Sequence, residues 1–250
     1  MSYQMVLDTS LLVAYENMDD KTKVKRLHKK LVMPYLTNKK QWVEARKQGL
    51  KIAEPEYRQY LAGLINQPES EDDLITLASR SLLKIILTEN KNLGLPYVHY
   101  KTGMISNQIT VTLSPTDDRT YLKTYLEMLC RNANKITICD SYFANNWENT
   151  RSLFHSVLPR KELMIEFSET ATSANATPNS SKINETFVKS VHPNWNVKIT
   201  TNIKYTNCHD RYLLVESPEG KVEIMLSSGF DHIWKNNPKE ITCIFRDVTC

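Results

Sequence analysis

The residues of this chain that are best suited to chemistry lie at 208–216, where a histidine, a guanidinium and a carboxylate are spaced along an apolar run. His209 and Arg211 alternate, so in a β-strand both side chains would point to the same face. An imidazole can act as a nucleophile and a guanidinium can bind two phosphate oxygens at once. We therefore predict a strand that presents a phosphate site, with His209, Arg211 and Glu216 as its catalytic residues.

A second apolar run, residues 222–226, ends at three small residues, Ser227, Ser228 and Gly229. Serine hydroxyls and the backbone N–H groups around a glycine can approach an anion closely, because no bulky side chain intervenes. These three residues are the predicted phosphate-binding turn.

His209-x-Arg211, four further residues, Glu216 and the later Ser-Ser-Gly turn resemble the H-x-K-x4-D…G-S motif of the phospholipase D-like superfamily. Arginine stands for lysine and glutamate for aspartate. The run HDRYLLVE…VEIMLSSGFDHIW is most similar to the phospholipase D-like C-terminal domain of MIT-domain proteins. Residues 133–143, A-x-K-I-T-I-x-D-x-Y-F, also resemble the opening of a phospholipase D-like half. The resemblance covers residues 115–250 and implies a layered α/β domain.

The resemblance implies a reaction in which one histidine attacks phosphorus and a second protonates the leaving oxygen, with no cofactor. Only one such motif occurs in the chain. A homodimer with two-fold symmetry would supply the second histidine from an identical chain. The alternative is a catalytically inactive module that binds a phosphorylated ligand, an anionic lipid or a protein partner.

The N-terminal half carries acidic residues at the predicted ends of strands and starts of helices. The segment VLDTSLLVAYE and the pattern D-L-I-T-L-A…I-I-L-T-E-N resemble parts of a PIN-like nuclease domain. The resemblance implies that carboxylates gather around Mg²⁺ or Mn²⁺, which prefer oxygen ligands, and activate water. The plainer interpretation is that these acids cap helices, which suits Asp73 especially well. The predicted metal ligands are Asp8, Glu54 (or Glu56), Asp73 and Glu89.

Residues 19–51 are rich in lysine and arginine, and apolar residues recur in them at helical spacing. The pattern predicts two basic amphipathic helices broken near Pro34. The helices would either expose a solvated charged face or follow a phosphate backbone, with salt-dependent binding of nucleic acid.

Turn residues at 114–118 place a domain boundary there, giving a basic α/β domain at 1–114 and a second domain at 115–250. Beyond the boundary, predicted helices alternate with apolar strands, which is typical of a mixed sheet with helices on both faces. A net charge of +4 permits an anionic partner without requiring one. No apolar run is long enough to span a membrane and no leader pattern is present, so we expect a cytoplasmic protein.

Three functions remain open from the sequence. The first is a phosphodiesterase that acts on nucleic acid, which by analogy would suit bacterial defence. The second is the inactive phosphate-binding module described above. The third is a structural protein whose two domains serve a larger complex. Arginine at position 211 favours the second, since a guanidinium binds phosphate firmly and stays protonated.

Overall fold

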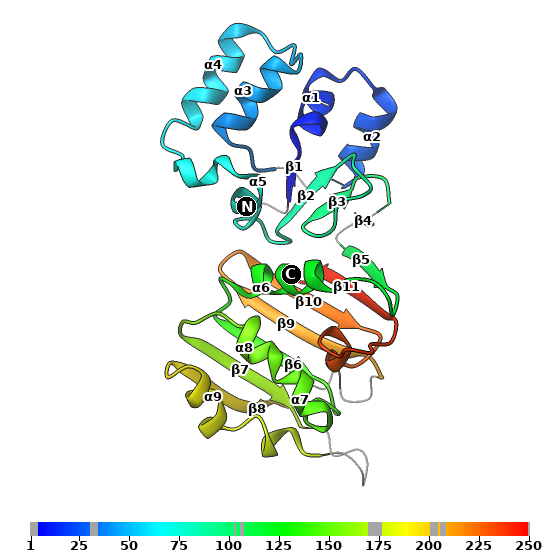
Figure 1. Cartoon of the computed structure of the whole chain (residues 1–250). Helices are drawn as coiled ribbons and strands as arrows, with labels where there is room; N and C mark the ends of the chain where they lie inside the picture. Colours follow the sequence, from blue (N-terminus) through cyan, green and yellow to red (C-terminus); the bar gives the residue numbers. More distant parts are fainter. Residues whose placement is uncertain are drawn as a thin grey trace. The chain divides into compact units, whose positions relative to one another are not determined.

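The computed structural model describes residues 5–30, 35–102, 104–105, 108–169, 177–200, 205 and 209–249. The chain divides into two compact units, residues 1–108 and 109–250 (Figure 1). The predicted boundary at 114–115 lies beyond strand β5 (Gln108–Leu113), which belongs to the sheet of the second unit.

The first unit contains a three-stranded parallel sheet in the order β1-β2-β3. Its strands are short and apolar, and every residue of β1 and β2 is buried. The strands are β1 (Met5–Leu7), β2 (Ile85–Thr88) and β3 (Tyr97–His99), and a further short strand, β4 (Met104–Ile105), follows them.

Helices fill the connection between β1 and β2 in the first unit. Their bounds are α1 (Thr9–Asn17), α2 (Lys21–Lys30), α3 (Lys39–Lys47), α4 (Glu54–Gly63) and α5 (Leu74–Ala78), with a 3₁₀ turn at Glu69–Asp72. The two predicted basic helices correspond to α2 and α3, while Pro34 lies outside the described residues. Helix α3 buries Trp42 and Ala45, whereas α4 buries none of its residues.

The second unit is built on one mixed sheet in the order β5-β11-β10-β9-β6-β7-β8. Strands β6, β7 and β8 are parallel, while β9 runs antiparallel to β6 and β10 runs antiparallel to both β9 and β11. The bounds are β6 (Lys135–Cys139), β7 (Leu163–Ser168), β8 (Trp195–Thr200), β9 (Arg211–Ser217), β10 (Gly220–Leu226) and β11 (Ile241–Asp247).

The helices of this unit pack on one face of the sheet, as Figure 1 shows. Ring contacts place them there: Tyr125 of α6 meets Phe245 of β11, and Phe154 of α8 meets Trp195 of β8. The expectation of helices on both faces is therefore wrong for the described residues. The helices are α6 (Thr120–Cys130), α7 (Trp147–Thr150), α8 (Ser152–Ser156) and α9 (Glu185–Val191).

The composition of the opposite face explains why the helices pack on one side of the sheet. Its side chains include Thr137, Glu166, Glu216 and Glu223, alternating with the apolar residues that meet the helices. Lysines pair with the carboxylates, since Glu166 contacts Lys135 and Lys198. The described helices pack against the apolar side of the strands, although Thr137, Glu166 and Glu223 of the polar side are also buried. The mixed α/β class predicted from the sequence is confirmed.

Candidate anion-binding site

The carboxyl ends of β6, β7 and β8 and the amino end of β9 meet at one edge of the second sheet. Cys139 of β6 pairs with Tyr212 of β9, which brings the next residue, Asp140, beside Arg211. Arg211 in turn pairs with Leu226 at the end of β10, just before the turn that contains Gly229. Ligands commonly bind at this edge of α/β sheets, because the connecting loops gather there.

A cavity of about 460 Å³ opens at this edge, and we call it the Arg211 pocket. Three cations, one imidazole and one carboxylate line it together with polar and aromatic groups. The lining residues are Tyr142, Asn145, Asn146, Arg211, Gly229, Asp231, His232, Lys235 and Lys239.

Asp140 holds the wall of this pocket together. Its carboxylate is almost fully buried, accepts a hydrogen bond from the backbone N–H of Tyr142 at 2.9 Å, and lies 3.9 Å from Arg211 Nε. Burial raises the pKa of the Asp140 carboxyl, while the Tyr142 N–H and the Arg211 charge act in the opposite direction. The Asp140 carbonyl also accepts from the side chain of Asn179, which ties in the loop before α9.

A buried arginine positions the loop that carries the other cations. Arg119, just before α6, donates to the backbone carbonyls of His232 and Lys239, each at 3.0 Å. The same guanidinium reaches the carbonyls of Ser114 and Asp117, so one side chain connects the start of the unit to its pocket. Because a guanidinium has five fixed donors, it can hold four carbonyls in one arrangement.

His232 is buried at the pocket and is constrained to one tautomer when neutral. Its Nδ1 accepts a hydrogen bond from the backbone N–H of Lys239 at 3.0 Å, so the proton of the neutral ring is on Nε2. Burial lowers the pKa of His232, which favours the neutral ring. The imidazole can thus donate from Nε2. The structure places the ring in the lining of the Arg211 pocket.

His209, the predicted nucleophile, does not lie in a strand. It is exposed in a bend two residues before β9 begins at Arg211, and it is not among the residues lining the pocket. The prediction that His209 and Arg211 share one strand face is therefore wrong, although the two remain neighbours in the chain. His209 is exposed and the Arg211 side chain is partly exposed.

Glu216 lies at the far end of β9 from Arg211. Its carboxylate contacts Lys135 at 3.4 Å and Lys221 at 3.0 Å. It comes five positions after Arg211 along the strand, which corresponds to roughly 17 Å at the usual rise per residue. The structure therefore gives Glu216 a place in the charged face of the sheet, apart from the Arg211 pocket.

Of the three residues in the predicted phosphate-binding turn, the two serines and the glycine have different surroundings. The Ser227 hydroxyl accepts from the backbone N–H of Thr242, and the Ser228 hydroxyl donates to the carbonyl of Glu240, both at 2.9 Å. Both serines thus fasten β10 to β11. Gly229 does line the pocket, and a Cβ there would lie 2.3 Å from Asp231 Oδ1. Only glycine permits the Asp231 carboxylate to occupy that position.

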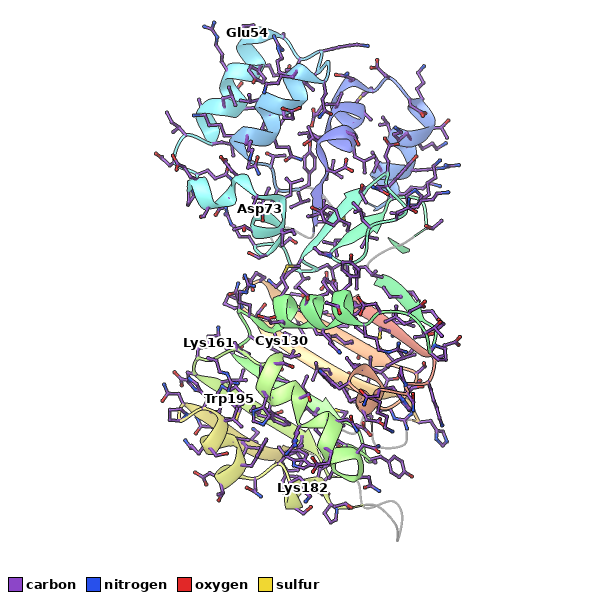
Figure 2. The ribbon with its side chains drawn as sticks, viewed as in Figure 1. Glu54, Asp73, Cys130, Lys161, Lys182 and Trp195 are labelled. Atoms are coloured by element: carbon purple, nitrogen blue, oxygen red, sulfur yellow. The ribbon has the colours of Figure 1, made fainter. Side chains whose placement is uncertain are left out.

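The four predicted metal ligands of the first unit have separate partners. Asp8 caps α1 and accepts from Leu11 N–H, and Asp73 caps α5 and accepts from Thr76 N–H, each at 2.8 Å. Figure 2 labels Glu54 and Asp73 at well-separated points of this unit.

The two glutamates of that set are bound by basic side chains. Glu54 is paired with Arg46 and Arg58, and Glu89 with Lys23 at 2.6 Å. Among the described residues, no group of three His, Cys, Asp or Glu side chains is arranged to hold a metal ion. The four acids do not fit a shared Mg²⁺ or Mn²⁺ site, so we derive no metal-dependent step from them.

The fold and the pocket define a mixed α/β protein with a basic, polar cavity at one sheet edge. No protein-family model matches the chain, and no curated protein matches it in sequence. Within the ranges that the structure describes, every helix is too short or too polar to cross a lipid bilayer.

Several residues of the pocket escaped the sequence analysis. Asp231, Lys235 and Lys239 come after Gly229 and are spaced four positions apart, in the pattern D-H-x-x-K-x-x-x-K, and this spacing was the available signal. Lys235 Nζ forms an ion pair with Asp231 in the structure. Asp140 is the aspartate of the motif at 133–143, whereas Arg119 carries no such signal, because its partners are distant in the sequence.

Proposed function

We propose that the second unit binds a ligand through a phosphate group held in the Arg211 pocket. The observation that carries this proposal is the convergence of Arg211, Lys235 and Lys239 on one cavity. Three cations face two carboxylates, Asp140 and Asp231, so the positive charge at the site exceeds the negative charge. An anion entering the cavity gains attraction from this excess.

Arg211 is the residue best able to recognise the phosphate. Its Nε lies 3.9 Å from Asp140 Oδ1, which is too long for a hydrogen bond. The guanidinium is thus attracted to the Asp140 carboxylate without donating a hydrogen bond to it. A guanidinium matches two phosphate oxygens in a bidentate arrangement, and the neutral His232 can add an N–H donor.

Calorimetric titration of the full chain with O-phosphoserine, a phosphate monoester, and with a dinucleotide, a phosphodiester, tests this proposal. We expect binding that weakens as salt rises and that is lost in the Arg211→Gln, Lys239→Gln double variant. The Arg211 pocket would be rejected as a phosphate site if the double variant bound both probes with the affinity of the parent protein. It would also be rejected if neither probe bound the parent protein at low salt.

A second candidate is hydrolysis of a phosphodiester, and the exposure of His209 two residues before Arg211 favours it. In that reaction a histidine nitrogen bonds to phosphorus as the leaving oxygen departs with a proton from a second histidine, and water then releases the phosphate. The second histidine would come from another copy of the chain, which makes a homodimer part of this candidate.

Labelled single- and double-stranded DNA and RNA, incubated with and without EDTA, test the second candidate. Cleavage that survives EDTA and is lost in His209→Ala would support it. Binding without cleavage of any substrate would leave the Arg211 pocket as a recognition site only. Light scattering after size exclusion would show in parallel whether the chain forms the required dimer.

A further inference from the structure

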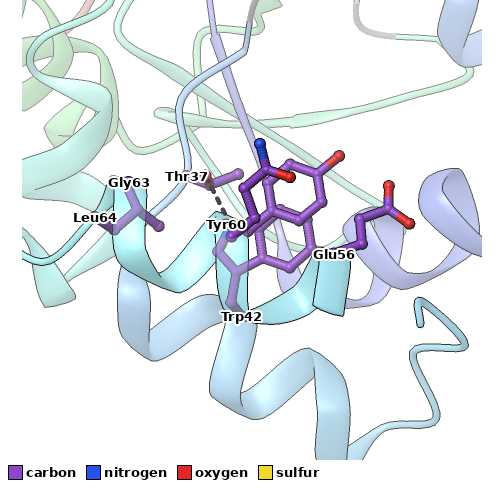
Figure 3. Close-up of a pocket in the computed structure, with 7 residues that line it drawn as sticks. Thr37, Trp42, Glu56, Tyr60, Gly63 and Leu64 are labelled. Carbon is purple, nitrogen blue, oxygen red and sulfur yellow. Dashed lines mark hydrogen bonds between the residues drawn. The ribbon is translucent and has the colours of Figure 1, made fainter. Parts of the chain in front are cut away.

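A second cavity, of about 420 Å³, lies in the first unit, and we call it the α3–α4 pocket (Figure 3). Helix α4 forms one wall of this cavity. Glu56, Tyr60 and Gly63 are spaced by four and three positions, so they lie on the same side of the helix. The lining residues are Thr37, Trp42, Glu56, Gln59, Tyr60, Gly63 and Leu64. Nothing in the Arg211 pocket of the other unit bears on this cavity.

The pocket has a firmly held aromatic floor. Trp42 is only 2% exposed, and its Nε1–H donates to the Thr37 hydroxyl at 3.0 Å. Tyr60 stacks on Trp42 with ring centroids 4.4 Å apart and planes at 12°, and it remains 39% exposed. Because the buried indole fixes the phenol ring beneath the cavity, Tyr60 presents aromatic surface without needing to reorder.

The charges around this floor are negative. Glu56 is the one charged residue of the lining, and it precedes Tyr60 by one helical turn, so its carboxylate lies on the Tyr60 side of α4. Desolvation raises the pKa of Tyr60, and the charges of Glu16 and Glu56 raise it further. Both carboxylates therefore lie near the same hydroxyl. Within the described part of the chain, neither Glu16 nor Glu56 forms an ion pair with a basic side chain.

Elsewhere on α4, a glutamate and a tyrosine bind a cation from the chain itself. On the neighbouring face of α4, the guanidinium of Arg46 lies 4.8 Å from the centre of the Tyr57 ring and 3.0 Å from a Glu54 oxygen. Glu56 and Tyr60 repeat this pair of groups on the face that lines the cavity. There the chain supplies an aromatic ring and a carboxylate but no cation from the lining.

We propose that the α3–α4 pocket binds a guanidinium-bearing ligand, with the planar cation over the Tyr60 ring and its N–H donors on the Glu56 carboxylate. A guanidinium is weakly hydrated, stacks on aromatic rings and forms charge-assisted hydrogen bonds with carboxylates. Gln59 and Thr37 offer further polar contacts at the rim. The guanidinium can belong to a small molecule or to an arginine side chain of a partner.

Titration calorimetry of the full chain with L-argininamide tests the proposal. L-citrullinamide is the matched probe, because it keeps the shape and loses the charge. We expect argininamide to bind at least about tenfold more tightly than citrullinamide. A Gly-Arg-Gly peptide distinguishes the source: tighter binding than argininamide identifies a peptide arginine, and weaker binding identifies a small molecule.

Variants locate the binding. Glu56→Gln keeps the size of the side chain and removes its charge, and it should weaken argininamide binding by about tenfold or more. Glu54→Gln, on the same helix but bound to Arg46, should leave the affinity within about twofold of the parent. Tyr60→Leu should also weaken binding, with circular dichroism to confirm folding. Equal binding of citrullinamide, unchanged affinity in Glu56→Gln, or no detectable argininamide binding would overturn the proposal.

Discussion

Arg211 Nε lies 3.9 Å from Asp140 Oδ1, with the aspartate side chain 3% exposed and the arginine side chain 24% exposed. The pair joins the end of β6 to the start of β9 across adjacent strands. The distance permits Coulombic attraction without a direct hydrogen bond. Asp140 thereby holds the guanidinium at the pocket while leaving its donors for a ligand.

Replacing Arg211 should remove the main phosphate contact. We predict that Arg211→Gln weakens binding of O-phosphoserine by about tenfold or more, because a charge-assisted bidentate contact is lost. Lys161→Gln is the matched control: Lys161 is exposed and precedes β7, at the opposite sheet edge from Asp140, and Figure 2 labels it. The control should bind like the parent protein. Equal losses in both variants would show that only the overall charge matters.

The raised pKa of Asp140 predicts a pH-dependent effect of Asp140→Asn on stability. The folded state binds the Asp140 proton more tightly than the unfolded chain, whose pKa is near 3.8. Tighter proton binding stabilises the folded parent protein at pH values below about 3.8. This stabilisation is lost as the pH rises through the folded-state pKa of Asp140. The asparagine does not titrate, so the stability of Asp140→Asn relative to the parent should increase as the pH rises above about 4.

Urea denaturation at several pH values measures this difference in unfolding free energy. Asparagine can still accept the Tyr142 N–H, which preserves the local hydrogen bond. A difference between variant and parent that stays constant with pH would contradict the raised pKa.

The close approach at Gly229 makes alanine costly there. We predict that Gly229→Ala destabilises the second unit by about 1–3 kcal/mol and weakens phosphate binding, because the new methyl group displaces the Asp231 carboxylate. Gly63→Ala is the comparison, since a Cβ at Gly63 meets no atom within 4 Å. It should be neutral or stabilise by up to about 1 kcal/mol through helix propensity. Thermal unfolding and phosphoserine titration of both variants check the contrast.

A buried carboxylate on the polar sheet face depends on a tyrosine. Glu223 is 1% exposed, accepts a hydrogen bond from the Tyr205 hydroxyl, and lies 3.5 Å from Arg246 Nη1. Tyr205→Phe removes one donor from this buried charge and should cost about 1–3 kcal/mol of unfolding free energy. Tyr121→Phe, at a tyrosine that is 58% exposed, should change it by less than about 0.5 kcal/mol. Similar losses in both variants would show that the buried bond is not the cause.

Local sequence patterns predicted the elements well where apolar residues alternate or cluster. Strand β10 covers the apolar run at 222–226, and β6 lies within the motif at 133–143. Asp73 caps α5, in agreement with the plainer interpretation of that residue. The start of β9 was misplaced, because residues 208–216 alternate without marking where backbone pairing begins. That pairing requires a neighbouring strand, so it is a tertiary property.

The sequence by itself determined the mixed α/β class, the basic character of the chain and the presence of Arg211 two residues after a histidine. Only the tertiary structure decided which charges meet. Arg211, Asp140 and Lys239 come from different segments and converge because β6, β9, β10 and β11 are neighbours in the sheet. Glu216, five residues from Arg211, is carried away from it because a strand is extended. Spacing along a chain sets the direction of a side chain, whereas its partners are set by strand order.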